Sequence, residues 1–330
     1  MPAVFVRFGV AVTLALLVVV GAGCGTGAAG HSGEQTPAGG DRVVATEKGD
    51  VSIPADPQRI IVLNSALAGY FYALDVPVHG AIPLNTEAKE FPDLWADDAE
   101  EDGTVMIPWS NDGFELEALL AEEPDLIVAG GQGFPGSQAA EAYDQLTAIA
   151  PTVLVSSKLA RWQDELAFIA GDLLGAPEKG AALIETYEAR VTEVRHTITP
   201  PPTPVSYLLM LPDGRPWSIP ETSALPVTLG ELGLEPAPII SDNPDFETFG
   251  SGDSFDISKE LVDKVFVYPT IFVLGFQADV TSADELSQQK IYGELPAFKE
   301  GHAYDLPYWA HRADYLATME LLDLIEKEFS

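Results

Sequence analysis

A chain of 330 residues, 46% of them hydrophobic, is long enough to bury one large core or two medium ones. It carries 51 acidic and 17 basic residues, a formal net charge of -34 at pH 7. A surface of that sign repels phosphates and anionic lipid headgroups, which argues against nucleic acid and membrane lipid as direct partners. One cysteine and five histidines, none at i, i+4 spacing, exclude an internal disulfide and argue against a zinc site.

Residues 1–23 have the pattern of a secretory signal peptide. Arg7 precedes an apolar run from Val10 to Val20, and small residues lead from there to Cys24. The run is shorter than the roughly 20 apolar residues that span a bilayer. The segment resembles a bacterial lipobox, although Gly21 stands where that motif has Leu or Val. We therefore expect Cys24 to be lipidated, and the alternative is a plain signal peptide with an incidental cysteine.

Residues 24–42 are predicted to be the lipidated cysteine and a flexible tether. The segment is rich in Gly, Ser, Thr and Ala and has no hydrophobic periodicity, so it cannot bury enough apolar surface to fold. We expect an exported protein held by its lipid at the outer face of the bacterial cytoplasmic membrane.

Residues 43–175 alternate short apolar strands with amphipathic helices. Such alternation predicts an α/β lobe with a parallel sheet. The expected strands are 59–63, 78–84, 126–129 and 152–155, and the expected helices are 66–74, 114–121, 143–149 and 162–174.

Residues 176–203 are predicted to be one long helix and its stop. Apolar residues recur every three or four positions from Leu183 to Ile198 and form one face over five turns. Pro177 is placed to open the helix, and a proline-rich run from Pro200 ends it. A helix of this size is roughly 30 Å long, which is about the width of a lobe.

Residues 204–330 show a second α/β pattern. The expected strands are 205–211, 270–274 and 303–306, and the expected helices are 224–232, 258–265 and a C-terminal helix whose apolar face runs from Tyr315 to Phe329. The fold class is therefore α/β, with two Rossmann-like lobes joined by one long helix. A ligand is expected in the cleft between the lobes, where loops leave the strand ends.

Catalytic motifs are missing from the sequence. There is no Gly-x-Ser-x-Gly nucleophile elbow and no phosphate-binding loop, so we do not expect an enzyme. Gly130–Gly133 is expected to be a tight turn after a strand, and Asp97–Asp102 a solvated acidic loop. An extracellular enzyme with an unfamiliar site is the remoter alternative.

Six blocks stand in a fixed order between about Val43 and the end of the chain. They are Val51–Pro54 with Pro57–Leu63, Leu116–Leu119 with Glu123–Val128, Tyr143–Leu146 with Ile149–Val153, Leu229–Gly233, Ser258–Leu261, and Tyr304–Pro307 with Trp309. Together they resemble the iron-siderophore binding lipoproteins of ABC importers, whose relatives bind cobalamin and heme.

The resemblance implies a class III periplasmic binding protein of the helical-backbone type, with little hinge motion. It also implies a permease partner, onto whose arginines a glutamate on each lobe docks. By motif position these are Glu117 and Glu260. Two separated carboxylates would set the register of a basic partner. The alternative is two ordinary surface glutamates among 51 acidic residues.

Cleft residues follow no family motif, so they are predicted from aromatic and arginine side chains in loops after strand ends. Flat aromatic rings suit a bulky chelate, and guanidinium groups suit its oxygen atoms. For each aromatic residue alone, a packing role is an equal alternative. The candidates are Trp109, Trp162, Arg215, Trp217, Phe276, Tyr308, Trp309, His311 and Arg312.

The expected ligand is a ferric siderophore of the hydroxamate or mixed type, because the scarcity of arginine disfavours a highly anionic triscatecholate. Heme, with Tyr308 or His311 as the axial ligand, is the main alternative, and cobalamin is a weaker one. We expect no intrinsic cofactor, no directly bound metal and a monomer. A receptor that signals without transport is a further alternative.

Overall fold

The computed structural model describes residues 40–249, 252–276, 278 and 281–330. These residues belong to a single compact unit that holds both lobes. The predicted signal peptide, Cys24 and most of the predicted tether lie outside the described residues.

An antiparallel hairpin opens the described chain. It pairs β1 (Asp41–Thr46) with β2 (Gly49–Pro54), and alternation buries Val44 and Ile53 while their neighbours stay more exposed. The guanidinium of Arg42 donates to the carbonyl oxygen of Leu173 at 2.8 Å. The prediction that the tether reaches Arg42 is therefore wrong at its end, since the folded lobe begins at Asp41.

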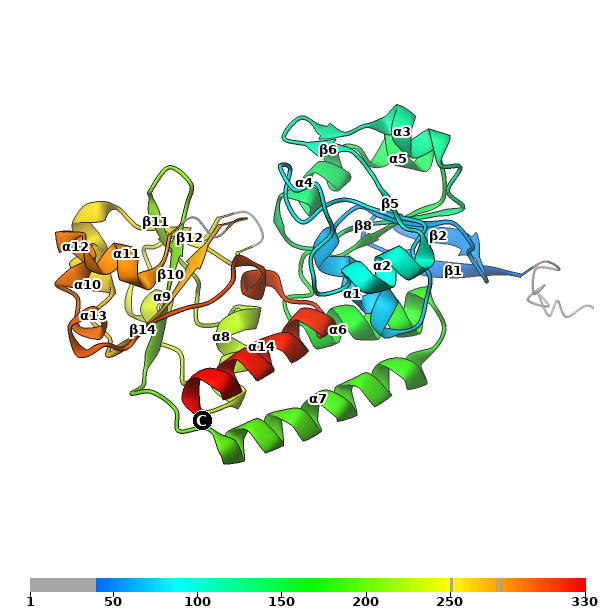
Figure 1. Cartoon of the computed structure of the whole chain (residues 1–330). Helices are drawn as coiled ribbons and strands as arrows, with labels where there is room; N and C mark the ends of the chain where they lie inside the picture. The colour runs from blue at the N-terminus through cyan, green and yellow to red at the C-terminus, as the bar shows by residue number, and fades with distance from the viewer. Residues whose placement is uncertain (1–39, 250–251, 277, 279–280) are drawn as a thin grey trace, which may run out of the picture. The chain divides into compact units, whose positions relative to one another are not determined.

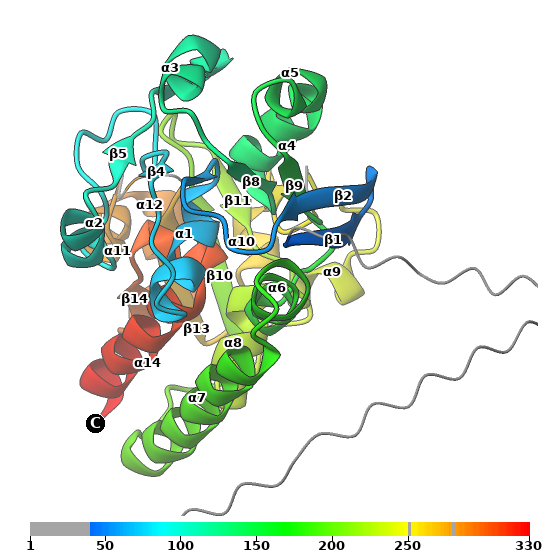
Figure 2. The same cartoon turned by 90° about the vertical axis from the view of Figure 1, so that its right-hand side faces the viewer.

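The first lobe is built on a parallel sheet of order β5-β4-β3-β8-β9. Side chains along β3 point alternately to the two faces of the sheet. Ile60 and Val62 pack in the core on one face, and Ile61 and Leu63, the residue after the strand, pack in the core on the other. Helices cover both faces (Figures 1 and 2). The elements are β3 (Ile60–Val62), α1 (Ser65–Ala73), β4 (Gly80–Ala81), α2 (Ala96–Asp102), β5 (Val105–Met106), α3 (Leu116–Ala121), β8 (Leu126–Gly130), α4 (Gly133–Glu141), α5 (Tyr143–Thr147) and β9 (Thr152–Val155), with a small hairpin of β6 (Trp109–Ser110) and β7 (Gly113–Phe114).

The second lobe has a mixed sheet of order β12-β11-β10-β13-β14. Strands β10, β13 and β14 run parallel, whereas β11 and β12 are antiparallel additions. The elements are β10 (Val205–Met210), β11 (Pro216–Ser218), α8 (Ala224–Glu231), α9 (Ile239–Asp242), β12 (Phe255–Asp256), α10 (Val262–Val265), β13 (Thr270–Gly275), α11 (Ala283–Ser287), α12 (Lys290–Gly293), α13 (Pro296–Glu300), β14 (Ala303–Asp305) and α14 (Tyr315–Phe329).

One long helix, α7 (Pro177–Thr197), connects the lobes, as predicted, and Pro177 lies in its first turn. The C-terminal helix α14 lies beside it (Figure 1), and the guanidinium Nη2 of Arg190 on α7 is 2.6 Å from Asp323 Oδ1 on α14. A single hydrophobic cluster runs from the first lobe through both helices into the second lobe and includes Val62, Tyr187, Leu209 and Leu322. This shared core opposes hinge motion, because opening the lobes would expose it to water.

Several element predictions need correction. The predicted acidic loop Asp97–Asp102 is wrong: these residues lie in helix α2, where Asp97 and Asp98 occupy the first turn and suit its dipole, and Asp102 accepts from the Val78 amide at 3.1 Å. The predicted helix 162–174 divides into α6 (Trp162–Ala167) and a π-helix, Phe168–Leu173. The predicted helix 258–265 is a 3₁₀ turn, Lys259–Leu261, followed by α10.

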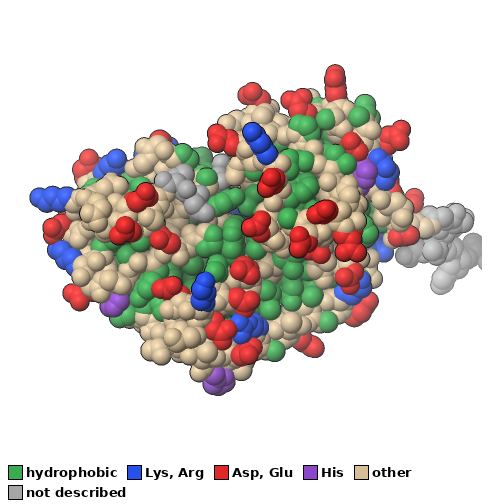
Figure 3. All heavy atoms as spheres, in the orientation of Figure 1, with side chains coloured by type: hydrophobic (Ala, Val, Ile, Leu, Met, Phe, Trp, Pro, Cys, Tyr) green, Lys and Arg blue, Asp and Glu red, His purple; other side chains and the backbone are tan. Residues whose placement is uncertain are grey.

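Acidic side chains are spread over both lobes on the face in Figure 3, with few basic ones between them. None of the helices in the described part of the chain is long and apolar enough to cross a membrane.

Candidate functional site

The first lobe contributes a rigid polar edge at the carboxyl ends of β3 and β8. Asn64 directly follows β3 and caps α1, accepting from the Ala66 amide at 3.1 Å. Its Nδ2 donates to the carbonyl oxygens of Gly130 at 2.7 Å and Gln132 at 3.0 Å. Asn64 is only 2% exposed, so these bonds fix the loop after β8 against the start of α1.

The sequence Gly130–Gly133 forms the predicted tight turn between β8 and α4. Gly130, Gly131 and Gly133 all have positive φ angles, which residues with a side chain rarely adopt. A Cβ on Gly130 would lie 2.4 Å from the carbonyl oxygen of Val155. Glycine therefore allows the turn to pass close to the end of β9.

Trp109 comes from β6 and is held by Gln138 of α4. The indole Nε1 donates to Gln138 Oε1 at 2.6 Å, and Gln138 Nε2 donates to the carbonyl oxygens of Ser110 at 3.2 Å and Asn111 at 3.0 Å. The indole thus keeps one orientation, and the residue is 7% exposed.

The second lobe contributes Phe276, just after β13, and the 3₁₀ turn Tyr308–Arg312. Arg312 donates from Nε to Asp253 Oδ2 at 2.5 Å and from Nη2 to Asp253 Oδ1 at 3.2 Å. Its guanidinium carbon lies 5.9 Å from the centre of the Phe276 ring. His311 Nε2 is 3.1 Å from the carbonyl oxygen of Asp253.

These edges enclose one pocket between the lobes, with about 530 Å³ of empty space including the part open to solvent. Six of the nine predicted cleft residues line it: Trp109, Phe276, Tyr308, Trp309, His311 and Arg312. The structure brings them together with residues the sequence did not single out, namely Asn64, Ser65, Ala66, Leu84, Gln132, Gly133 and Pro135.

The other three candidates do not line this pocket. Trp162 lines a smaller adjoining cavity and packs edge-on against Tyr187, with ring centres 4.8 Å apart. Trp217 is buried beneath Phe276, with ring centres 6.1 Å apart. Arg215 is exposed in the turn before β11, where its Nε is 2.8 Å from Asp213 Oδ2. Ligand contact by these residues stays a prediction without support from the geometry.

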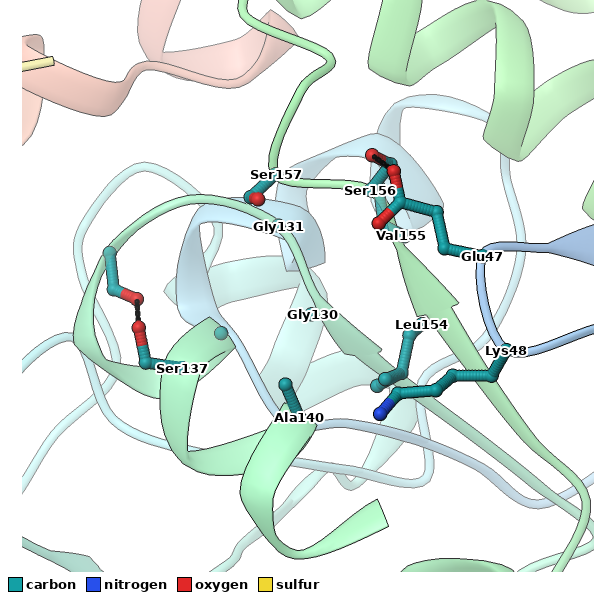
Figure 4. A pocket seen from close by; sticks show the side chains of 12 residues that line it. Glu47, Lys48, Gly130, Gly131, Ser137, Ala140, Leu154, Val155, Ser156 and Ser157 are labelled. Carbon is teal, nitrogen blue, oxygen red and sulfur yellow. Dashed lines mark hydrogen bonds between the residues drawn. The ribbon is translucent and has the colours of Figure 1, made fainter. Parts of the chain in front are cut away.

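A second hollow in the first lobe lies on the other side of the glycine turn (Figure 4). The β1–β2 turn supplies Glu47 and Lys48, while Ser137 and Ser156 come from α4 and the end of β9. Glu47 accepts from Ser156 Oγ at 2.8 Å and pairs with Lys158 Nζ at 2.9 Å. Its lining has none of the aromatic residues that surround the first pocket, which makes it the weaker candidate for a chelate.

Burial controls the ionisation of groups around the first pocket. Burial, with Arg312 beside it, lowers the pKa of His311 to about 4, so this imidazole is neutral at pH 7. Burial also raises the pKa of Glu165 to about 8 and that of Asp314 to about 6. Glu165 lines the adjoining cavity and accepts from the Tyr70 hydroxyl at 2.9 Å.

The two predicted docking residues are exposed, one on each lobe. Glu117 lies in the first turn of α3, and Glu260 lies in the 3₁₀ turn Lys259–Leu261. Neither has a hydrogen bond or ion pair among the interactions of the described residues, so each carboxylate is available to a partner. Cys24 lies outside the described residues.

The family model for periplasmic binding proteins matches residues 60–308. The chain belongs to the periplasmic binding protein family. This confirms the resemblance and the two-lobed fold predicted from the sequence. The family is made of binding proteins. The match covers both lobes, the connecting helix and the second-lobe aromatic residues up to Tyr308.

Individual members show the same relationship. The chain is 27% identical over 297 residues to the ferric enterobactin-binding periplasmic protein FepB of Escherichia coli O6:H1, covering 87% of this chain and 91% of that protein. It is 27% identical to the probable siderophore-binding lipoprotein YfiY of Bacillus subtilis, covering 84% of each. The crystal structure of holo-ViuP superimposes with a TM-score of 0.74 at 22% identity, over 88% of this chain and 95% of that one.

Sequence reasoning missed the residues that hold the pocket together. Asn64 could have been predicted as a pocket residue, because it is polar and directly follows a buried strand. Gln138 and Asp253 could not: Gln138 lies within an unpredicted helix, and Asp253 lies in an irregular loop 59 residues before its partner Arg312.

Proposed function

We propose that this chain is the extracytoplasmic substrate-binding component of a ferric siderophore ABC importer. The observation that carries the proposal is the pocket between the lobes, where the turn Tyr308–Arg312 and Phe276 face the polar edge around Asn64 and Trp109. Aromatic rings on opposite walls suit a bulky chelate, and fixed amides and a guanidinium suit its oxygen atoms. The names of FepB and YfiY support this ligand class.

We further propose a hydroxamate or mixed-type ligand. Arg312 is the one lysine or arginine among the described residues that line the pocket. Heme ligation through His311 is disfavoured, because His311 is 5% exposed and its Nε2 lies against the Asp253 carbonyl oxygen. Among the described residues no group of three or more His, Cys, Asp or Glu could hold a bare metal ion.

Delivery of the ligand would use Glu117 and Glu260 as docking points for arginines of the permease. Two exposed carboxylates, one on each lobe, would orient the protein and the pocket together over the translocation path. Lipidation of Cys24 would keep the protein close to that partner. The name of YfiY, a lipoprotein, supports the anchor.

The test is quenching of intrinsic tryptophan fluorescence in residues 25–330 by ferric siderophores, heme and cobalamin. Trp109 and Trp309 line the pocket, so a bound iron chelate should quench saturably. Trp309→Ala should weaken binding, whereas Arg215→Ala, outside the pocket, should not. Saturable quenching by heme alone would transfer the function to heme uptake. No saturable quenching by any of these ligands would contradict the transport proposal.

A further inference from the structure

The guanidinium of Arg312 forms an ion pair with the carboxylate of Asp253. Asp253 accepts from both Nε and Nη2 of the guanidinium, at 2.5 Å and 3.2 Å. The Asp253 side chain is 5% exposed and that of Arg312 is 21% exposed. A paired, mostly buried guanidinium and carboxylate attract each other strongly, because little water screens them.

Arg312 also contacts both walls of the pocket. On the first lobe it lies against Gly133, where a Cβ would be 2.9 Å from Nη1. On the second lobe it lies over the ring of Phe276. The guanidinium is thus fixed at the pocket wall by contacts with both lobes.

Arg312 is the one lysine or arginine among the described residues that line the pocket. Burial keeps His311 uncharged at pH 7 by lowering its pKa to about 4. Among these described residues, the carboxylate of Asp253 therefore balances the positive charge of Arg312 at the pocket wall.

We propose that Asp253 is a specificity-determining residue that neutralises Arg312 and so selects ferric chelates with little net charge. The inference rests on the proposed function. In a tris-hydroxamate, three singly charged groups balance Fe³⁺, whereas the doubly charged groups of a tris-catecholate leave a trianion. A balanced charge pair gives such a trianion no compensation for its lost hydration.

The test compares ferrichrome, a tris-hydroxamate, with ferric enterobactin, a tris-catecholate. Asp253→Asn keeps the shape of the side chain and exposes the charge of Arg312 to the ligand. The ratio of the two dissociation constants should shift towards ferric enterobactin by about tenfold or more, and added salt should reduce the shift. Asp253→Glu should retain the wild-type preference.

Two further variants separate charge selection from a structural role. Asp213→Asn removes another arginine-paired aspartate of this lobe, at an exposed turn away from the pocket, and should leave the ratio unchanged. In an Arg312→Gln background, Asp253→Asn should no longer shift the ratio, because the positive charge on which Asp253 acts is absent.

An unchanged ratio in folded Asp253→Asn, or a shift that persists without Arg312, would overturn the inference while the proposed function stands. If Asp253→Asn does not fold, the wild-type protein decides: tighter binding of ferrichrome supports the inference, and tighter binding of ferric enterobactin overturns it. If neither chelate, nor any other ferric siderophore, binds the wild type, the proposed function fails and the inference fails with it.

Discussion

The two lobes contribute different chemistry to the pocket they share. On the first lobe, Asn64 and Gln138 use their polar atoms to hold the protein's own turns and Trp109. On the second lobe, the turn Tyr308–Arg312 presents aromatic rings and a charged pair beside Phe276. We propose that the first wall maintains the shape of the pocket and that the second wall recognises the ligand through its charge and its ring surface.

The sheets account for this difference. The first lobe has a parallel sheet, whose strand ends meet at one edge and whose loops can be tied to each other. The second lobe adds antiparallel β11 and β12 to its sheet, and the loop before β12 delivers Asp253 to Arg312. Substitutions in the first wall should therefore affect stability, and those in the second should affect affinity.

The largest effect is expected on uptake, from the two docking residues, because each lobe contributes one exposed glutamate to the proposed contact with the permease. Glu117→Lys and Glu260→Lys together should reduce uptake of the ferric siderophore to background, because the two introduced ammonium groups would repel arginines of the permease. Ligand affinity should not change. The matched control is Glu188→Lys with Glu300→Lys, which reverses two other exposed glutamates. Normal uptake by the docking variant would refute the docking role and favour a receptor that does not transport.

The junction between the lobes should be the most sensitive place for stability. Gly69 on α1 leaves room for Asp314, the N-cap of α14, and a Cβ there would lie 2.0 Å from Asp314 Oδ2. Gly69→Ala should lower the free energy of unfolding by about 3 kcal/mol, because a buried carboxylate would be displaced from its partners. Denaturant unfolding measures this. Gly230→Ala, in α8 with its nearest atom 3.7 Å away, should be close to neutral, and an equal loss in both variants would contradict the prediction.

The contributions of Glu165 and His311 to the free energy of unfolding should change with pH in opposite directions. Burial raises the pKa of Glu165 from its ordinary value of 4.5 to about 8 in the folded chain, so its contribution to stability falls as pH rises between these values. His311 behaves oppositely: its contribution is present above pH 6.5 and is lost as pH falls towards about 4. Glu165→Gln should therefore stabilise the protein by on the order of 2 kcal/mol at pH 8.5 and by much less at pH 5.

Denaturant unfolding at several pH values measures both contributions, with the exposed Glu188→Gln as the control. A gain from Glu165→Gln that is equal at both pH values would show that the carboxyl is not protonated by burial.

The smallest effects are expected from replacing one tryptophan in each wall of the pocket. Trp309→Ala should weaken siderophore binding by about tenfold, because it removes ring surface from the recognising wall. Trp109→Phe keeps a ring but leaves Gln138 Oε1 without its donor, so it should cost stability more than affinity. Titration calorimetry and unfolding on the same two variants test this division. A larger loss of affinity from Trp109→Phe would reverse the roles of the lobes.

The parts of the fold with strong periodicity could be predicted from the sequence. The helix from Pro177 has one apolar face over five turns, and β10 and β13 are mostly apolar and buried at every position. Strands of two residues such as β4, and helices of four or five residues such as α12, carry too few positions to show a period. Tertiary contacts, rather than local pattern, determine them.

The candidate site likewise has residues that could be predicted from the sequence and residues that could not. The turn Tyr308–Arg312 could be proposed from composition, because aromatic residues and an arginine follow a strand. The pair of Asp253 with Arg312 joins residues 59 positions apart, and no local pattern connects them. Trp162 and Trp217 show the converse, since burial in packing contacts, not proximity to a strand end, determines their position.

The most direct test of the central claim is the location of iron in crystals of the protein grown with a ferric siderophore. Anomalous scattering at the iron edge should give one strong peak between the turn Tyr308–Arg312 and the edge around Asn64 and Trp109. A peak in the hollow beside Lys48 and Ser137, or only on the outer surface, would contradict the assignment of the pocket between the lobes.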